Sequence, residues 1–136
     1  METAETITAL LEAIKFFREQ YFSSAYSTMG FTIISAGWLI TSQSARVFLH
    51  SHRWLGMSAI IMLILTYIGY WEMSLGVQAL SQGISNQLML LGVDKVVFEH
   101  YELSIQGVYG FIFLQGLALV FTSLIIIAIL KDPGQE

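Results

Sequence analysis

The chain has 136 residues, of which 55% are hydrophobic and only 12% are charged, and its net charge is −4. Average soluble domains carry about 25% charged residues, and a soluble fold of this size leaves about a third of its surface in water. Composition therefore excludes a water-soluble domain and indicates lipid. The negative charge disfavours nucleic acid as a partner, and the lack of cysteine excludes disulfides and thiolate metal sites.

Residues 5–21 are predicted to form an N-terminal amphipathic helix that lies in the membrane interface. Apolar side chains recur there at three- and four-residue spacing, at Ile7, Leu10, Leu11, Ile14, Phe17 and Tyr21. Charged and polar side chains occupy the rest of the cylinder. A helix that packs on a partner subunit is the alternative interpretation.

The first membrane span is predicted over residues 22–42, which contain no charged residue. Small and hydroxyl side chains are frequent in this segment. Four of them, Ser27, Gly30, Gly37 and Thr41, fall close to one helical face. Membrane helices associate through close backbone approach at small residues and through hydroxyl hydrogen bonds, so this face is predicted to be a helix-packing face.

The second span is predicted over residues 54–72, with Trp54 and Trp71 about 26 Å apart at the rise of a helix. Tryptophans at that separation are typical of the two interfaces of a bilayer. A second interfacial helix is predicted over 76–92, between spans two and three. Its narrow apolar stripe consists of Val77, Leu80, Ile84, Leu88 and Leu91.

The third span is predicted over residues 104–130 and is the most hydrophobic of the three. Its first half is expected to contact other helices through Gly107, Gly110 and Gln115. The amide of Gln115 is the strongly polar side chain deepest in a span, and it is interpreted as a hydrogen-bonding contact between helices. Its candidate partners are Thr66, Tyr67 and Tyr70 on the second span.

The three histidines, His50, His52 and His100, are the candidate ligands for haem or another metal. His50 and His52 precede the second span and His100 precedes the third, so antiparallel spans place them at opposite faces of the bilayer. One chain does not easily bring them to a single iron. They are interpreted as interfacial residues, and no metal site is predicted. The alternative is haem b shared with a neighbouring subunit.

The sequence therefore predicts an all-α integral membrane protein with a single membrane domain over residues 1–136. An odd number of spans places the N- and C-termini on opposite sides of the membrane. Lysines and arginines divide three to three between the two sides, but their density in residues 43–53 favours a cytoplasmic position for that connection. The expected location is a bacterial inner membrane or an organellar membrane.

Three functional hypotheses are compatible with these patterns. The first is a small accessory or structural subunit, without catalytic activity or cofactor, that packs through its small-residue helix faces on other membrane subunits. The second is a small homo-oligomeric transport or pore component. The third is a haem- or quinone-associated electron-transfer subunit. The spans lack internal charge, which transport paths normally contain, and no catalytic motif is present, so the first hypothesis is favoured.

Overall fold

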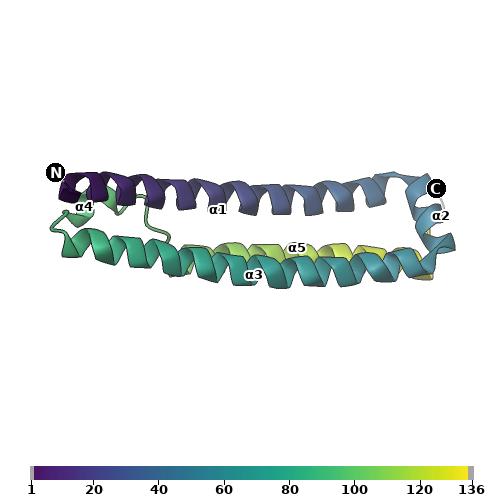
Figure 1. The fold of residues 1–136 in the computed structure, drawn as a ribbon. Helices are drawn as coiled ribbons and strands as arrows, with labels where there is room; N and C mark the ends of the chain where they lie inside the picture. Colours follow the sequence, from purple (N-terminus) through teal and green to yellow (C-terminus); the bar gives the residue numbers. More distant parts are fainter. Residues whose placement is uncertain (1, 135–136) are drawn as a thin grey trace. The chain divides into compact units, whose positions relative to one another are not determined.

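The computed structural model describes residues 2–134, and every regular element in this part of the chain is an α-helix (Figure 1). Three of the helices are long and two are short. Their bounds are α1 Glu2–Thr41, α2 Gln43–Ser51, α3 Arg53–Leu90, α4 Lys95–Phe98 and α5 Ile105–Lys131. The all-helical fold class is thereby confirmed.

Neither of the two predicted interfacial helices is a separate element. Residues 5–21 belong to α1, a single helix of 40 residues, and most of 76–92 belongs to α3, a single helix of 38 residues. No proline lies near the predicted boundaries at Phe22 and Glu72, and the residues around them are compatible with a helix. Because nothing interrupts the backbone hydrogen bonds there, the helices continue.

Three helices begin at residues whose side chains cap them. The Ser42 hydroxyl accepts a backbone N–H at 3.2 Å at the start of α2, and the Asp94 carboxylate accepts one at 3.2 Å at the start of α4. The Ser104 hydroxyl accepts the N–H of Gly107 at 3.0 Å at the start of α5. These oxygens satisfy N–H groups that the first turn of a helix leaves unpaired.

The end of α3 is fixed by Gly92, whose φ is +84°. Its N–H donates to Met89 O at 3.0 Å, and the N–H of Val93 donates to Leu88 O at 3.0 Å. This pair of bonds is a Schellman motif, in which a left-handed residue terminates a helix and is usually glycine. The side chain of Val93 also packs against Leu88 and its neighbours, so the hydrophobic contact that accompanies the motif is present.

The chain divides into two compact units. Unit 1 comprises Met1–Ala25 and Glu72–Phe111, and unit 2 comprises Tyr26–Trp71 and Ile112–Glu136. Parts of α1, α3 and α5 contribute to both units, whereas α4 lies in unit 1 and α2 in unit 2. The part of α3 that belongs to unit 2, residues 53–71, contains one charged residue, Arg53, at its start.

Unit 1 buries a row of mainly polar side chains on α3. The buried positions alternate at spacings of four and three residues, as in helices that pack like a coiled coil. They are Ser74, Gln78, Ser81, Ser85 and Leu88. The predicted apolar stripe is therefore only partly buried, because Leu88 is inaccessible whereas Leu80 is 52% exposed.

Hydrogen bonds to the segment before α5 account for the inward position of two members of this row, Ser81 and Ser85. Ser81 Oγ accepts the buried N–H of Leu103 at 3.0 Å, and Ser85 Oγ donates to Glu102 Oε2 at 3.0 Å. The backbone of that non-helical segment needs partners inside the unit. The apolar core of unit 1 is a smaller cluster of Ile14, Leu88 and Phe98, from α1, α3 and α4.

In unit 2 the buried positions of α5 also recur mainly at spacings of three and four residues, but the side chains there are mostly apolar. The fully or nearly fully buried α5 residues in this unit are Ile112, Gln115, Thr122, Ile126, Ile129 and Leu130. Thr32 and Ala36 of α1 and Tyr70 of α3 are buried with them in the unit. The interior of unit 2 is therefore built from one face of each long helix.

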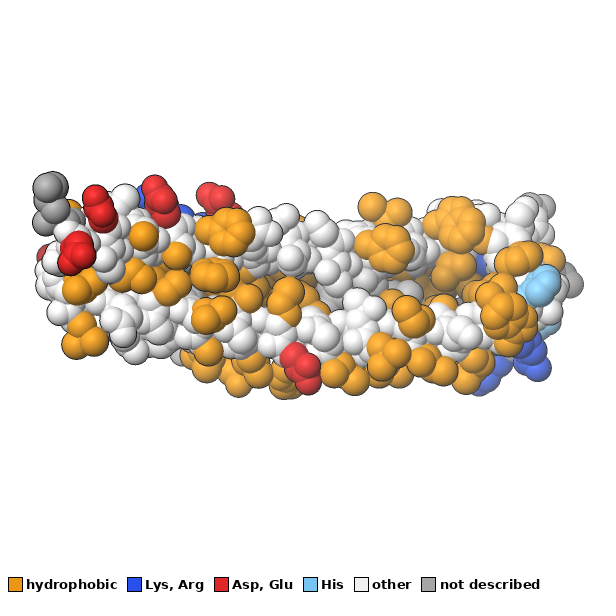
Figure 2. All heavy atoms as spheres, in the orientation of Figure 1, with side chains coloured by type: hydrophobic (Ala, Val, Ile, Leu, Met, Phe, Trp, Pro, Cys, Tyr) orange, Lys and Arg blue, Asp and Glu red, His pale blue; other side chains and the backbone are white. Residues whose placement is uncertain are grey.

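Large hydrophobic side chains cover the surface of unit 2, as orange atoms in Figure 2 illustrate. Both α3 and α5 are long and apolar enough to cross a membrane, and only 11% and 28% of their most apolar windows are buried. A core helix of a soluble protein would bury most of such a window. The exposed apolar surface fits a membrane location, and the span predicted within α1 remains a prediction.

Candidate functional site

The small-residue face of α1, defined as Ser27, Gly30, Gly37 and Thr41, is turned away from the other helices of unit 2. Ser27, Gly37 and Thr41 are exposed, and a Cβ atom added to Gly30 or Gly37 would meet nothing within 4 Å. The buried side of α1 lies on the opposite face, at Thr32 and other residues. The predicted packing residues on α1 therefore form a surface that no part of unit 2 occupies.

Bulky apolar side chains surround the small-residue face. Ile34, between the two glycines, is 73% exposed, and Phe31 and Trp38 are 72% and 61% exposed. The small residues therefore leave a shallow depression between bulky apolar side chains on the surface of α1. Another membrane helix can approach a surface of this kind closely.

Close helix approach inside unit 2 uses other glycines. A Cβ on Gly56 of α3 would lie 2.8 Å from Leu130 Cδ2, and a Cβ on Gly116 of α5 would lie 3.0 Å from the Tyr67 hydroxyl. The predicted positions Gly107 and Gly110 behave differently. Gly107 meets the capping hydroxyl of Ser104, and Gly110 faces open space. Gly56 was missed because a single glycine in an apolar stretch has no spacing partner to mark it.

Gln115 forms a contact between helices, but with a different partner from the residues proposed on α3. Its Nε2 donates to Thr32 Oγ1 of α1 across a long 3.5 Å bond, and the side chain is 96% buried. Its Oε1 is buried and has no hydrogen-bond partner among the described residues. The hydroxyl of Tyr67 instead donates to Ile112 O at 3.3 Å.

An apolar cavity of about 350 Å³ lies between α1, α3 and α5 in unit 2. Hydroxyl groups of Thr28, Thr32, Ser35, Thr66 and Thr122 line it together with apolar side chains. Thr32 and Thr122 donate their hydroxyls to carbonyls of their own helices, four residues earlier. The cavity is thus less polar than its composition suggests, and it contains no charged side chain.

Arg46 of α2 connects the end of α1 with the segment that follows α5. Its Nε donates to Pro133 O at 3.0 Å, just beyond α5, and its guanidinium also contacts the carbonyls of Leu39 and Ile40 in the last turn of α1. The final carbonyls of a helix lack partners within the helix and carry its negative end. Arg46 therefore satisfies carbonyls in the last turn of α1 and a carbonyl just beyond the end of α5.

His50 and Arg53 contact carbonyls in the last turn of α5. His50 Nδ1 lies 3.0 Å from Ile129 O, and an Arg53 nitrogen donates to Leu130 O at 2.8 Å. Because a carbonyl accepts only from a protonated nitrogen, the neutral ring of His50 keeps its lone pair on Nε2. The sequence indicated His50 as a candidate ligand but not its contact with α5, since nothing local in the sequence shows which carbonyl it faces.

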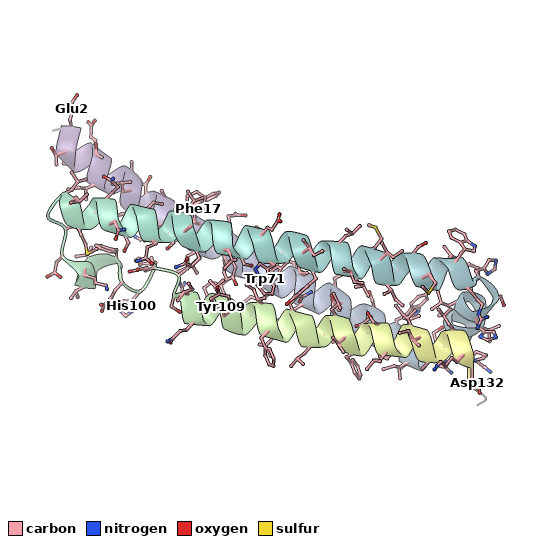
Figure 3. All side chains as sticks on the ribbon, turned by 90° about the horizontal axis from the view of Figure 1, so that it is seen from below. Glu2, Phe17, Trp71, His100, Tyr109 and Asp132 are labelled. Atoms are coloured by element: carbon pink, nitrogen blue, oxygen red, sulfur yellow. The ribbon has the colours of Figure 1, made fainter. Side chains whose placement is uncertain are left out.

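The other two histidines lie in different surroundings. His52 Nδ1 lies 3.0 Å from Phe48 O, and the two rings are 4.5 Å apart. His100 lies in unit 1, in the segment between α4 and α5 (Figure 3). Within residues 2–134, no group of three or more histidine, cysteine or acidic side chains is arranged to hold a metal ion.

Comparison of the chain with models of known protein families, with curated proteins and with solved structures finds no match.

Proposed function

We propose that this protein is a membrane-embedded accessory subunit, and that it docks on another membrane protein through the small-residue face of α1. The observation that carries the proposal is the exposure of Ser27, Gly37 and Thr41, with open space at Gly30 and Gly37. In lipid, large side chains contact acyl chains as readily as small ones do. Small residues are an advantage where the backbone of a second helix approaches closely.

Unit 2 is the part proposed to lie in the bilayer. The stretches 53–71 of α3 and 112–131 of α5 are each about 30 Å long at 1.5 Å per residue, which matches the hydrocarbon core. Arg46 and Arg53 then lie at one interface, and Glu72 at the other. The part of α1 within unit 2 is proposed to be a further span, the first in chain order. Three spans in total would place the two termini on opposite sides of the membrane.

The test replaces Gly37 with leucine in the protein expressed in its own membrane. Gly37→Leu adds a side chain where nothing in unit 2 is displaced, so the chain is expected to accumulate normally while its complex in mild detergent dissociates. Gly69→Leu is the matched control, because Gly69 is an equally open glycine on α3. The control is expected to leave the complex intact.

Native mass measurement of the extracted particle reads out the result. Partner mass lost in Gly37→Leu and retained in Gly69→Leu supports the docking surface. A particle that keeps its partner in both variants contradicts it. A wild-type particle made only of copies of this chain contradicts the accessory role and favours the homo-oligomeric transport hypothesis.

A further inference from the structure

Unit 1 contains a cavity of about 210 Å³ between α1, the segment after α4 and the first turns of α5. Its walls carry both signs of charge and an aromatic lining, with Arg18, Tyr21, Phe22, His100, Glu102 and Phe111 among the lining residues. In the sequence these residues flank the stretches proposed to cross the bilayer, which are the part of α1 in unit 2 and residues 112–131 of α5. If those stretches occupy the bilayer, the cavity lies at the level of the lipid headgroups.

One side of the cavity is suited to an anion. The Arg18 guanidinium lies 4.9 Å from the centre of the Phe22 ring, and among residues 2–134 no carboxylate forms an ion pair with it. Ser104, which caps α5, and Gly107, in the first turn of α5, line the same cavity. Arginine side chains bind phosphate oxygens through several charged hydrogen bonds, and the N-terminal turn of a helix adds positive potential.

The same cavity also carries a group suited to a cation. Glu102 is held in place by the Ser85 hydroxyl, which donates to its Oε2 at 3.0 Å, and the remaining carboxylate oxygen can accept further bonds. Tyr21, Phe22 and Phe111 stand edge to face around the cavity, with ring centres 5.6 to 6.1 Å apart. Aromatic faces beside a carboxylate are the surroundings that bind ammonium groups.

We infer that this cavity binds an amino-phosphate ester, a group with a phosphate and an ammonium two carbons apart, as in the headgroup of phosphatidylethanolamine. The phosphate contacts Arg18 and the Ser104 hydroxyl, which can donate its own hydrogen while it accepts from Gly107, with His100 as a further donor. The ammonium contacts Glu102 and the aromatic rings. A purely anionic ligand would bring a second negative charge into the cavity that Glu102 already lines, so the presence of both Arg18 and Glu102 in one cavity favours a zwitterion.

The test measures lipid retention by the full chain in detergent by native mass spectrometry. Phosphatidylethanolamine is compared with phosphatidylglycerol, which has the same phosphate but no ammonium. The wild type is expected to retain the ethanolamine lipid about tenfold more tightly, as for one charge-assisted hydrogen bond. Arg18→Gln is expected to lose both lipids. Glu102→Gln, which can still accept from Ser85, is expected to lose only the preference for ethanolamine.

Lys15→Gln and Glu99→Gln are the matched controls, because each removes the same charge nearby without lining the cavity. Both are expected to bind like the wild type. Loss of binding in the controls, or an unchanged lipid preference in Glu102→Gln, overturns the inference. Free phosphoethanolamine added as a competitor separates the two sources: displacement of the lipid at equal concentration assigns the cavity to a soluble ester, and no displacement assigns it to the lipid.

Discussion

Units 1 and 2 share the same three long helices but bury different chemistry on them. In unit 1 the inward face of α3 is a row of mainly hydroxyl and amide side chains, and two of them, Ser81 and Ser85, form hydrogen bonds with the irregular segment before α5. In unit 2 the inward face of α5 is mostly apolar, and the outward surface is apolar as well. Ser81 shows that a polar residue can face inward to satisfy non-helical backbone, and not only where water lies outside.

The largest effect is expected from filling a close contact in unit 2. Gly116→Leu places a branched side chain where a Cβ alone lies 3.0 Å from the Tyr67 hydroxyl. Overpacking of this kind costs about 3 kcal/mol, so thermal unfolding in detergent should occur well below the wild-type temperature. Gly69→Leu, in open space, should unfold near the wild-type temperature. Equal unfolding temperatures for the two variants would mean that α3 and α5 are not packed at Gly116.

The next effect separates two serines of the hydroxyl row in unit 1. Ser81→Ala leaves the buried N–H of Leu103 without its acceptor, which costs about 1–3 kcal/mol. Ser74 is equally buried, but its hydroxyl has no hydrogen-bond partner among the described residues. Ser74→Ala should therefore be neutral or stabilising. Denaturation midpoints of the two variants decide the point, and similar losses in both would argue against a specific role for Ser81.

A smaller pair of opposite effects is expected from glycines of α3. Gly92→Ala forces alanine into a left-handed conformation and should destabilise the protein by about 1 kcal/mol. Gly83 lies inside the helix with open space at its Cβ, so Gly83→Ala should stabilise by up to about 1 kcal/mol. Hydrogen exchange of the amides in residues 84–98 should respond in opposite directions. A change of the same sign in both variants would contradict the Schellman motif.

The smallest effect is expected from the paired change His50→Gln and His52→Gln. A glutamine amide can donate to Ile129 O as the His50 ring does, so stability and assembly should stay close to wild type. The absorption spectrum of the purified wild type is expected to contain no Soret band. A Soret band that disappears in the double variant would instead support the electron-transfer hypothesis, because an amide does not replace imidazole as an iron ligand.

Sequence patterns predicted the helical class, and the predicted range 104–130 differs from α5 by one residue at each end. They did not predict that α1 and α3 run through Phe22 and Glu72, because a charge after an apolar stretch resembles a membrane boundary even when the helix continues. The inward row of Ser81 and Ser85 was also missed. Its partners lie in a segment distant in sequence, and periodicity alone favours the apolar stripe.

The candidate surface on α1 could be found from composition, because small residues at helical spacing are visible in the sequence. Its outward direction could not, since a glycine that faces a neighbour and a glycine that faces outward have the same pattern. Gly37 and Gly56 illustrate the difference: the first has open space at its Cβ, and the second touches Leu130.

The capping role of Arg46 and Arg53 constrains how the insertion of this chain could be redirected. Orientation in a membrane follows the distribution of lysine and arginine beside the spans, and the usual way to invert it is to remove positive charge from one side. Here that removal would also release the carbonyls of Ile40, Leu130 and Pro133. An inverted form is better sought by adding lysines at exposed positions near the N-terminus, such as Thr8, where no helix end depends on the side chain.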